Sequence, residues 1–499
     1  MEPQTQAADS EAMERHRRAL GRGFNWLGGA TIIAKITDFS TIIVVLLYLT
    51  KQQMGIGSLV LSFGMVVEAF DGLGTGDALV QAQSVSRRQL DSLFWFIMAA
   101  AVLVAGLALA AAPLVQQIYG SAGMAVYFIA LAAKQPLVGA AVIPLALLNR
   151  ELRYERIAVI NVGSTFGAAM TRLAIALAGG GAWALVGGYM ASGVFILAGA
   201  LWARPFLPAF RFHWQPILPL VRFGLRSAAA NVFEQIFKNV DYFLVGWFYG
   251  AAQLAVYRVA FDVAMEPAMA VGTLVNRTAL PVFARVAAVR EHLTAALLWS
   301  LQRLTTLVAP FMVALILIAV PLTSLLHDSQ GNSYAAAALP LQILAGAAVL
   351  RVTSQLLTPV LMASGNPGTA MGVSAATLVL LSAGIFAAGL HFPAHSGVIA
   401  VSAVWFCVYP LLLIWGVRYL KQHWQIKLLD LVRPFGTPSL GIAAMVLVTE
   451  AARHLTGNHD PKLQIGIVLA ATGLTYAGLL LHARWVSQRQ SAQVSVGGS

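Results

Sequence analysis

Basic side chains occur in the middle of long apolar segments, where a membrane helix ordinarily carries none. A charge near the bilayer centre costs about 2.5–3.5 kcal/mol on insertion scales, so such residues usually line a cavity or pair with one another. Arginine binds phosphate oxygens as a fork and lysine as a point charge, so a cationic cleft could hold an anionic head group such as a diphosphate. The candidates for this substrate-binding cleft are Lys35, Lys134, Arg172, Arg258, Arg351 and Lys238.

The alternative for each of these bases is a structural ion pair with an acid one helical turn away. Three bases have such a neighbour in the sequence: Lys35 with Asp38, Lys238 with Glu234 or Asp241, and Arg258 with Asp262. The other three have no acid within helical reach, so their pairing would need another helix. Between Lys238 and Arg258, we expect Arg258 to hold the ligand and Lys238 to neutralise its neighbours.

The acids of the same segments are candidates for coupling to a cation. A carboxyl that is shielded from water can exchange a proton or bind Na⁺, and the alternatives are ion pairing or snorkelling to the membrane surface. Pro267 follows Glu266 and frees a carbonyl in mid-helix, which favours a hinge or a cation site there. No metal or other cofactor is expected beyond H⁺ or Na⁺. The ion-coupling candidates are Asp38, Asp71, Asp241, Asp262 and Glu266.

Two consecutive helices in residues 223–286 carry their polar side chains as stripes. On the first, the polar residues are three or four apart and therefore share one face: Asn231, Glu234, Lys238 and Asp241. On the second they are spaced by four: Arg258, Asp262 and Glu266. The two helices are expected to meet at a tight turn at Gly250-Ala251-Ala252.

The composition identifies an integral membrane protein. Of the 499 residues, 59% are hydrophobic and only 10% are charged, whereas a soluble domain has about 25% charged residues. The apolar segments are too long and unbroken for barrel strands, so the fold is all-α. At about 20 residues per crossing we expect about 14 transmembrane helices. They lie near residues 24–49, 56–83, 93–119, 122–148, 156–178, 182–203, 224–249, 251–284, 299–327, 335–363, 368–391, 395–420, 436–454 and 463–483.

The net charge of +12 follows the positive-inside pattern and does not indicate nucleic-acid binding. Most Lys and Arg lie in alternate loops, which predicts that both termini are cytoplasmic. The polar first stretch leads straight into an apolar span, so no cleavable signal peptide is expected. The loops are too short to hold a catalytic domain, and neither a phosphate-binding loop nor a nucleophile elbow occurs, so we do not expect an enzyme.

The first and second sets of six spans look like copies at an offset of about 200 residues. Six helices that repeat in the same orientation predict two lobes. The predicted organisation includes a proline-broken segment from Arg204 to Arg222 between the lobes. Its parts are an N-terminal tail (1–23), an N-lobe (24–203), an inter-lobe linker (204–223), a C-lobe (224–420), a second linker (421–435), a last helix pair (436–484) and a C-terminal tail (485–499).

The stretch from Asp241 to Ala260, DYFLVGWFYGAAQLAVYRVA, resembles the seventh-to-eighth helix signature of the bacterial polysaccharide and O-antigen flippases. These belong to the multidrug/oligosaccharidyl-lipid/polysaccharide flippase superfamily. Pro267, the run PVFARV from Pro281 to Val286 and the run GTGDALVQ from Gly74 to Gln81 fit the same pattern. The chain departs from it at Ala255, where the family usually has Gly, and at Ala284, where it often has Ser.

The resemblance implies two lobes in a V-shaped arrangement that open alternately to either leaflet, plus a C-terminal helix pair. The implied cargo is an undecaprenyl-diphosphate-linked oligosaccharide, moved across the bacterial inner membrane for surface polysaccharide assembly. Membrane lipids, and polysaccharide polymerase or export proteins, are the implied partners. A cationic cleft suits this cargo, because its diphosphate carries negative charge through a region of low dielectric constant.

Two other functions stay open from the sequence. A multidrug or toxin antiporter of the same superfamily would move a small organic cation. Such a site favours net acid in the first lobe, but there Lys35, Lys134 and Arg172 accompany Asp38 and Asp71. A scaffolding protein would have little use for so many charged residues inside the membrane.

Overall fold

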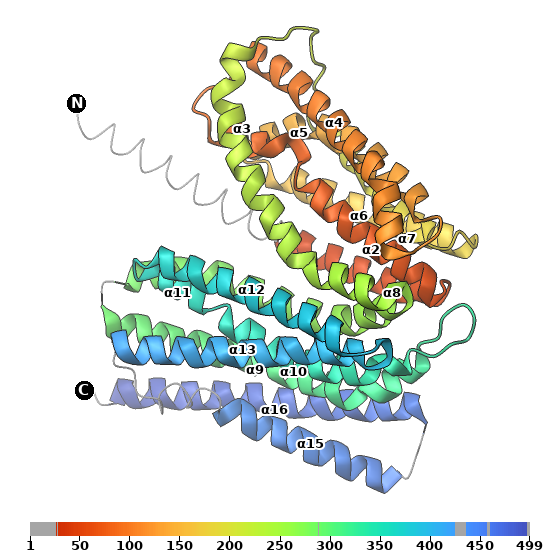
Figure 1. Cartoon of the computed structure of the whole chain (residues 1–499). Coiled ribbons are helices and arrows are strands. Elements are labelled where there is room, and N and C mark those ends of the chain that lie inside the picture. The colour runs from red at the N-terminus through yellow and green to blue at the C-terminus, as the bar shows by residue number, and fades with distance from the viewer. Residues whose placement is uncertain (1–25, 27, 288, 425–435, 457–459, 497–499) are drawn as a thin grey trace, which may run out of the picture. The chain divides into compact units, whose positions relative to one another are not determined.

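The computed structural model describes residues 26, 28–287, 289–424, 436–456 and 460–496, which are almost entirely helical (Figure 1). The chain divides into two compact units, Met1–Ala255 with Asp328–Gln330, and Val256–His327 with Gly331–Ser499. Ten helices in the described part are long and apolar enough to cross a membrane. The predicted all-α membrane fold is thereby confirmed, while the count of about 14 spans stays a prediction.

The first unit is a bundle that contains the red to yellow-green elements of Figure 1. Its elements are the span Gly28–Leu46, α2 (Lys51–Glu68), η1 (Asp71–Gly74), α3 (Thr75–Gln81), α4 (Arg87–Tyr119), η2 (Met124–Tyr127), α5 (Phe128–Arg150), α6 (Tyr154–Leu177), α7 (Trp183–Ala203) and the first part of α8 (Trp214–Val286).

Helices α2 and α4 begin at capping boxes that their sequences encode. Thr50 Oγ1 accepts a hydrogen bond from Gln53 N at 3.1 Å, and Gln53 Oε1 accepts one from Thr50 N at 3.0 Å. Ser86 and Gln89 repeat this arrangement before α4. Each box satisfies amide hydrogens that have no partner within the helix, so it sets the residue at which the helix starts.

The second membrane segment is broken rather than continuous. Gly72, Leu73 and Gly74 have φ values of 58°, 48° and 66°, all in the left-handed region, so η1 separates α2 from α3. Leucine in this conformation costs about 1–2 kcal/mol. The predicted span over 56–83 corresponds to the candidate membrane span Lys51–Gln81, and this break, which the sequence analysis does not predict, lies inside it. The break also permits a close approach, because a Cβ added at Gly74 would lie 2.3 Å from the carbonyl oxygen of Gly224 on α8.

Helix α8 contains both helices of the predicted polar pair. The helix departs from helical geometry at Gly250 (φ 80°, ψ 174°), so the predicted meeting point is confirmed. The helix begins at Trp214, however, which corrects the prediction of a proline-broken segment up to Arg222. Pro216 does not prevent this start, because it lies in the first turn, where amide hydrogens have no helical acceptor.

The first part of α8 packs within the first unit. Tyr119 Oη on α4 donates a hydrogen bond to the carbonyl of Phe243 at 3.3 Å. The Phe63 ring on α2 lies 4.7 Å from that of Phe243, centroid to centroid. The unit consequently extends to Ala255, whereas the sequence places the boundary between lobes in residues 204–223.

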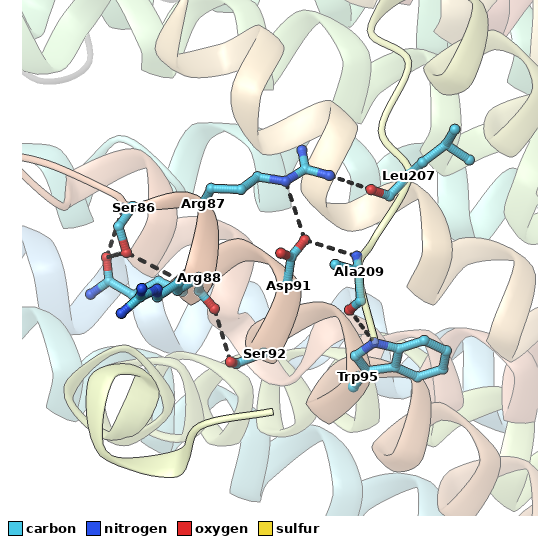
Figure 2. A network of polar contacts seen from close by, with 9 residues as sticks. Ser86, Arg87, Arg88, Asp91, Ser92, Trp95, Leu207 and Ala209 are labelled. Carbon is cyan, nitrogen blue, oxygen red and sulfur yellow. Dashed lines mark hydrogen bonds and ion pairs between the residues drawn. The ribbon is translucent and has the colours of Figure 1, made fainter. Parts of the chain in front are cut away.

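The connection between α7 and α8, residues 204–213, is an extended segment bound to the start of α4, and we call it the strap (Figure 2). Arg87 donates to the carbonyl of Leu207 and pairs with Asp91 at 3.3 Å. Asp91 accepts a hydrogen bond from Ala209 N at 3.2 Å, and Trp95 Nε1 donates to Ala209 O at 3.0 Å. All three contacts to the strap use its main chain.

Two further contacts help to attach the strap. His213 N donates to Ser92 Oγ at 2.9 Å, just before α8 begins. Phe206 is buried in an apolar cluster with residues of α3, α4, α5 and α8, and the Arg87 guanidinium lies 4.5 Å from its ring centroid. Burial of this large aromatic ring removes apolar surface from solvent and so adds to the stability of the strap.

The second unit contains the rest of α8 and the later helices. They are α9 (Arg290–Leu325), η3 (Ala335–Ala337), α10 (Ala338–Ser354), α11 (Leu357–Ala363), α12 (Pro367–His391), α13 (Ala394–Trp424), α15 (Gly436–Thr456) and α16 (Pro461–Val496). Helix α10 packs against α9 and α13, and α15 and α16 both contact α9. The predicted N-terminal tail and most of the linker 421–435 lie outside the described residues.

We expect Gly55→Ala to destabilise the first unit. The added Cβ would lie 1.7 Å from the carbonyl oxygen of Ala251, so α2 and α8 would have to separate. Overpacking of this kind lowers the free energy of unfolding by about 1–3 kcal/mol. The loss should appear as a lower unfolding midpoint of the purified protein in detergent. Gly106→Ala is the matched control, because a Cβ at Gly106 meets no atom within 4 Å. Equal midpoints for the two variants would contradict this packing.

Candidate functional site

Two cross-helix ion pairs neutralise charges inside the first unit. Arg172 Nη1 on α6 lies 2.8 Å from Asp38 Oδ1 on the span Gly28–Leu46. The arginine side chain is 9% exposed and the aspartate 42%. The sequence offers Asp38 a partner one turn away, Lys35, and the structure adds Arg172 from another helix.

The second pair joins α5 to α2. Lys134 Nζ contacts the Glu68 carboxylate and also lies 3.4 Å from the ring centroid of Tyr189 on α7. Tyr189 Oη donates a hydrogen bond to the carbonyl of Gly64 at 2.9 Å. The Lys134 ammonium is buried, so the carboxylate and the π face together replace the water it would otherwise bind.

Asp71 lies beside this pair, at the break between α2 and α3. Its electrostatic neighbours are Glu68, Lys134 and Gln135. In the described part of the chain, the buried atoms Asp71 Oδ1 and Gln135 Nε2 have no hydrogen-bond partner. Buried polar atoms without a partner are rare in native proteins, and they concentrate at strained or functional sites.

The polar stripe on the first part of α8 is only partly buried. Lys238 Nζ lies 2.6 Å from Glu234 Oε1, and their side chains are 47% and 56% exposed. Exposed pairs of this kind contribute little to stability. Asp241, one turn further along, is buried. The predicted pairing of Lys238 with Glu234 is confirmed, while the roles proposed for Lys238 and Asp241 stay predictions.

In the second unit, Arg258 pairs with Asp262 on the same helix. The Arg258 Nε to Asp262 Oδ2 distance is 3.1 Å, and the side chains are 9% and 15% exposed. This is the i,i+4 pair that the sequence predicts. Glu266, a further turn along, is half-buried. A carboxylate therefore already neutralises the arginine that was preferred for cargo binding.

Arg351 has a different environment from the other buried bases. It is buried on α10, and its guanidinium lies 4.8 Å from the ring centroid of Trp405 on α13. Trp405 Nε1 donates to Tyr257 Oη at 2.9 Å. Among the described residues, Arg351 forms no ion pair with a carboxylate. An arginine on an aromatic face keeps its full charge, so it can bind an anion.

The aromatic residues around Arg351 were not identified as candidates from the sequence. Phe261 and Tyr409 flank Trp405, with centroid distances of 5.4 and 6.1 Å. They lie on α8 and α13, which are about 150 residues apart in the chain. Aromatic residues in apolar helices are ordinary core positions, so no local signal distinguishes this cluster.

Comparison with known proteins identifies related sequences over most of the chain. The profile of the family described as "Polysaccharide biosynthesis protein" matches residues 47–336. The teichuronic acid biosynthesis protein TuaB of Bacillus subtilis (strain 168) is 25% identical over 82% of this chain and 84% of its own length. The succinoglycan biosynthesis transport protein ExoT of Rhizobium meliloti (strain 1021) is 25% identical over 89% of each chain.

Two solved structures share the fold. The lipid II flippase MurJ, in an inward closed conformation, superposes with a TM-score of 0.71 at 13% identity and covers 92% of this chain and 99% of its own. An inward-facing multidrug resistance transporter of the MATE family has a TM-score of 0.61 at 14% identity, over 79% of this chain and 94% of its own. At these identities the likeness concerns the fold alone.

We expect Lys134→Met to destabilise the protein strongly, because it leaves Glu68 and Asp71 without a counter-charge. Removing one partner of a buried pair costs about 3–5 kcal/mol, and the partial exposure of Glu68 favours the lower value. The double variant Lys134→Met/Glu68→Gln should recover more than half of this loss in an unfolding titration with SDS. A double variant no more stable than Lys134→Met would show that Glu68 is not the counter-charge.

Proposed function

Because this chain belongs to the polysaccharide biosynthesis protein family, we propose that it flips an undecaprenyl-diphosphate-linked oligosaccharide across the membrane by alternating access. The direction is from the cytoplasmic to the periplasmic leaflet, for assembly of a surface polysaccharide. Relatives named for teichuronic acid and succinoglycan biosynthesis support a glycan cargo. The chain acts as a transporter and carries out no chemical step.

The buried, carboxylate-free guanidinium of Arg351 is the observation that carries the proposal. A diphosphate is an anion whose oxygens match the planar donors of arginine. Transfer of such an anion through a medium of low dielectric constant needs a compensating positive charge along the way. Arg351 supplies that charge, and the aromatic rings next to it provide apolar faces.

The other predicted bases have a smaller share in cargo binding under this proposal. Four of them lie against carboxylates, so each presents little net charge to an anion: Lys134, Arg172, Lys238 and Arg258. Opening any of these pairs would leave an acid uncompensated, at a cost of several kcal/mol when it is buried. Lys35 is exposed and stays a candidate on the first span.

Export of an organic cation is the competing function, since a multidrug transporter shares the fold. Arg351 disfavours this alternative, because a buried arginine without a counter-charge repels a cationic drug. The relatives named for polysaccharide biosynthesis also favour the glycan.

The location follows from the same proposal. The protein spans the bacterial inner membrane several times, with both termini in the cytoplasm. Its partners are the lipid-linked glycan, the surrounding lipids and the polymerase or export proteins that receive the glycan. Coupling to H⁺ or Na⁺ through one of the buried acids supplies a driving force.

We expect Arg351→Gln to slow flipping by about ten- to hundredfold, the equivalent of one lost charge-assisted hydrogen bond of about 1.5–3 kcal/mol. The probe is an undecaprenyl-diphosphate disaccharide with a fluorescent sugar, in proteoliposomes. Its appearance in the outer leaflet is followed by chemical quenching.

Arg303→Gln is the matched control for this variant. Arg303 also lies over a tryptophan, 5.3 Å from the Trp299 ring centroid, but it is exposed. It should flip the probe at the wild-type rate. The unfolding midpoints of both variants are measured as well. If Arg351 has only a structural role, Arg351→Gln should lower the midpoint without a specific effect on flipping. If wild-type vesicles transport tetraphenylphosphonium and not the glycolipid, the glycan proposal fails.

A further inference from the structure

We propose that the pocket formed by Glu68, Asp71, Lys134, Gln135 and Tyr189 in the first unit binds one exchangeable monovalent cation, either Na⁺ or a proton, at Asp71. This site lies wholly within the first unit and is separate from Arg351. Its use in driving flipping rests on the proposed function, whereas the binding itself does not.

The charge balance of the pocket is the first argument. It contains two carboxylates, Glu68 and Asp71, and one ammonium, Lys134. Lys134 is committed to Glu68 by direct contact, and its ammonium also lies over the Tyr189 ring. When both acids are ionised, one negative charge is left over. An uncompensated charge inside a membrane protein is costly, so the pocket requires one more positive charge.

The helix break adds to this requirement. Helix α2 ends at Glu68, has no basic residue in its last turn, and is followed by Ala69, Phe70 and Asp71. The C-terminal end of a helix carries a partial negative charge from its unpaired carbonyls. Two ionised carboxylates at that end are repelled by this partial charge, unless a cation lies among them. Interrupted membrane helices commonly offer such ends to Na⁺ or H⁺.

The unpartnered atoms identify where the cation lies. Gln135 is 2% exposed, and its Nε2 has no hydrogen-bond partner among the described residues. Gln135 is a side-chain hydrogen-bond neighbour of the Asp71 carboxyl, whose Oδ1 is buried and lies beyond hydrogen-bond distance of any described group. Which amide atom of a glutamine points to a neighbour is decided by the hydrogen-bond network. With Oε1 turned towards Asp71, carboxylate and amide oxygens converge, as Na⁺ requires; with Nε2 there, the amide supports a carboxyl that carries the proton.

The groups that interact with Asp71 come from three helices, although α4 also packs against the segment that contains it. Glu68 lies on α2, Lys134 and Gln135 lie on α5, and Tyr189 lies on α7. Asp71 as a whole is half-buried, so the bound cation can exchange. The left-handed Leu73, two residues after the acid, stores strain, which is typical of functional sites.

The test measures cation binding on the purified full-length protein in two arms, with radioactive Na⁺ at fixed pH and by infrared spectroscopy without Na⁺. In the Na⁺ arm, the wild type should bind one Na⁺ per chain saturably, and Asp71→Asn should not. In the proton arm, the wild type should show a protonated carboxyl band that Asp71→Asn removes. A positive result in either arm supports the site and identifies its cation.

Glu68→Gln keeps the proposal falsifiable if Asp71→Asn fails to fold. This change leaves one acid and one base, so Lys134 can neutralise Asp71, and we expect the cation to be lost although Asp71 is intact. Asp77→Asn is the matched control. Asp77 lies on α3, is exposed and accepts a hydrogen bond from Ser227 at 2.9 Å. It should bind the cation as the wild type does.

The proposal is overturned if the wild type binds no Na⁺ and shows no carboxyl band that depends on Asp71, or if Glu68→Gln retains the cation. Flipping of the fluorescent glycolipid is measured separately on the same preparations. Cation binding without flipping would refute the proposed function and leave the site in place. Flipping without cation binding would refute the site alone.

Discussion

An ionised side chain inside a bilayer is costly unless an opposite charge or an aromatic face lies beside it, and in the first unit the need for an opposite charge links particular helices. Lipid tails are as apolar as leucine, so burial of apolar surface gives helices little reason to choose one neighbour over another. The pair Lys134–Glu68 joins α5 to α2, and Arg172–Asp38 joins α6 to the first span. Each pair links helices far apart in sequence, so the charges act as specific connectors.

Close contacts at glycine provide the second source of specificity. The backbone of α8 approaches the backbone of the second membrane segment twice, at Gly55 against Ala251 and at Gly74 against Gly224. Dispersion contacts at such short separations compensate for the missing hydrophobic effect. The two contacts lie near opposite ends of the segment, which explains why the first part of α8 belongs to the first unit.

The sequence predicts the periodic features well and the non-local ones poorly. Length and hydropathy locate most helices to within a few residues, and the spacing of Arg258 and Asp262 predicts their pairing. The helix break is not predicted, although Gly72 and Gly74 are part of it, because glycine is common in membrane helices that stay intact. The partner of Lys134 could not be found, since one sequence contains no information about which distant helices are neighbours.

The strap between α7 and α8 has a consequence for how this protein tolerates sequence change. Its hydrogen bonds to α4 use carbonyl and amide groups at Leu207, Ala209 and His213, which every residue type except proline can provide in full. Its own side chains hold it at only some positions, such as Phe206, which is buried, and Phe210, whose ring is stacked 4.8 Å from that of Trp95. The side chains that grip it belong to α4. Replacements at Leu207, Ala209 or His213 can therefore leave the path of the strap unchanged, whereas changes at Phe206, Asp91 or Trp95 loosen it.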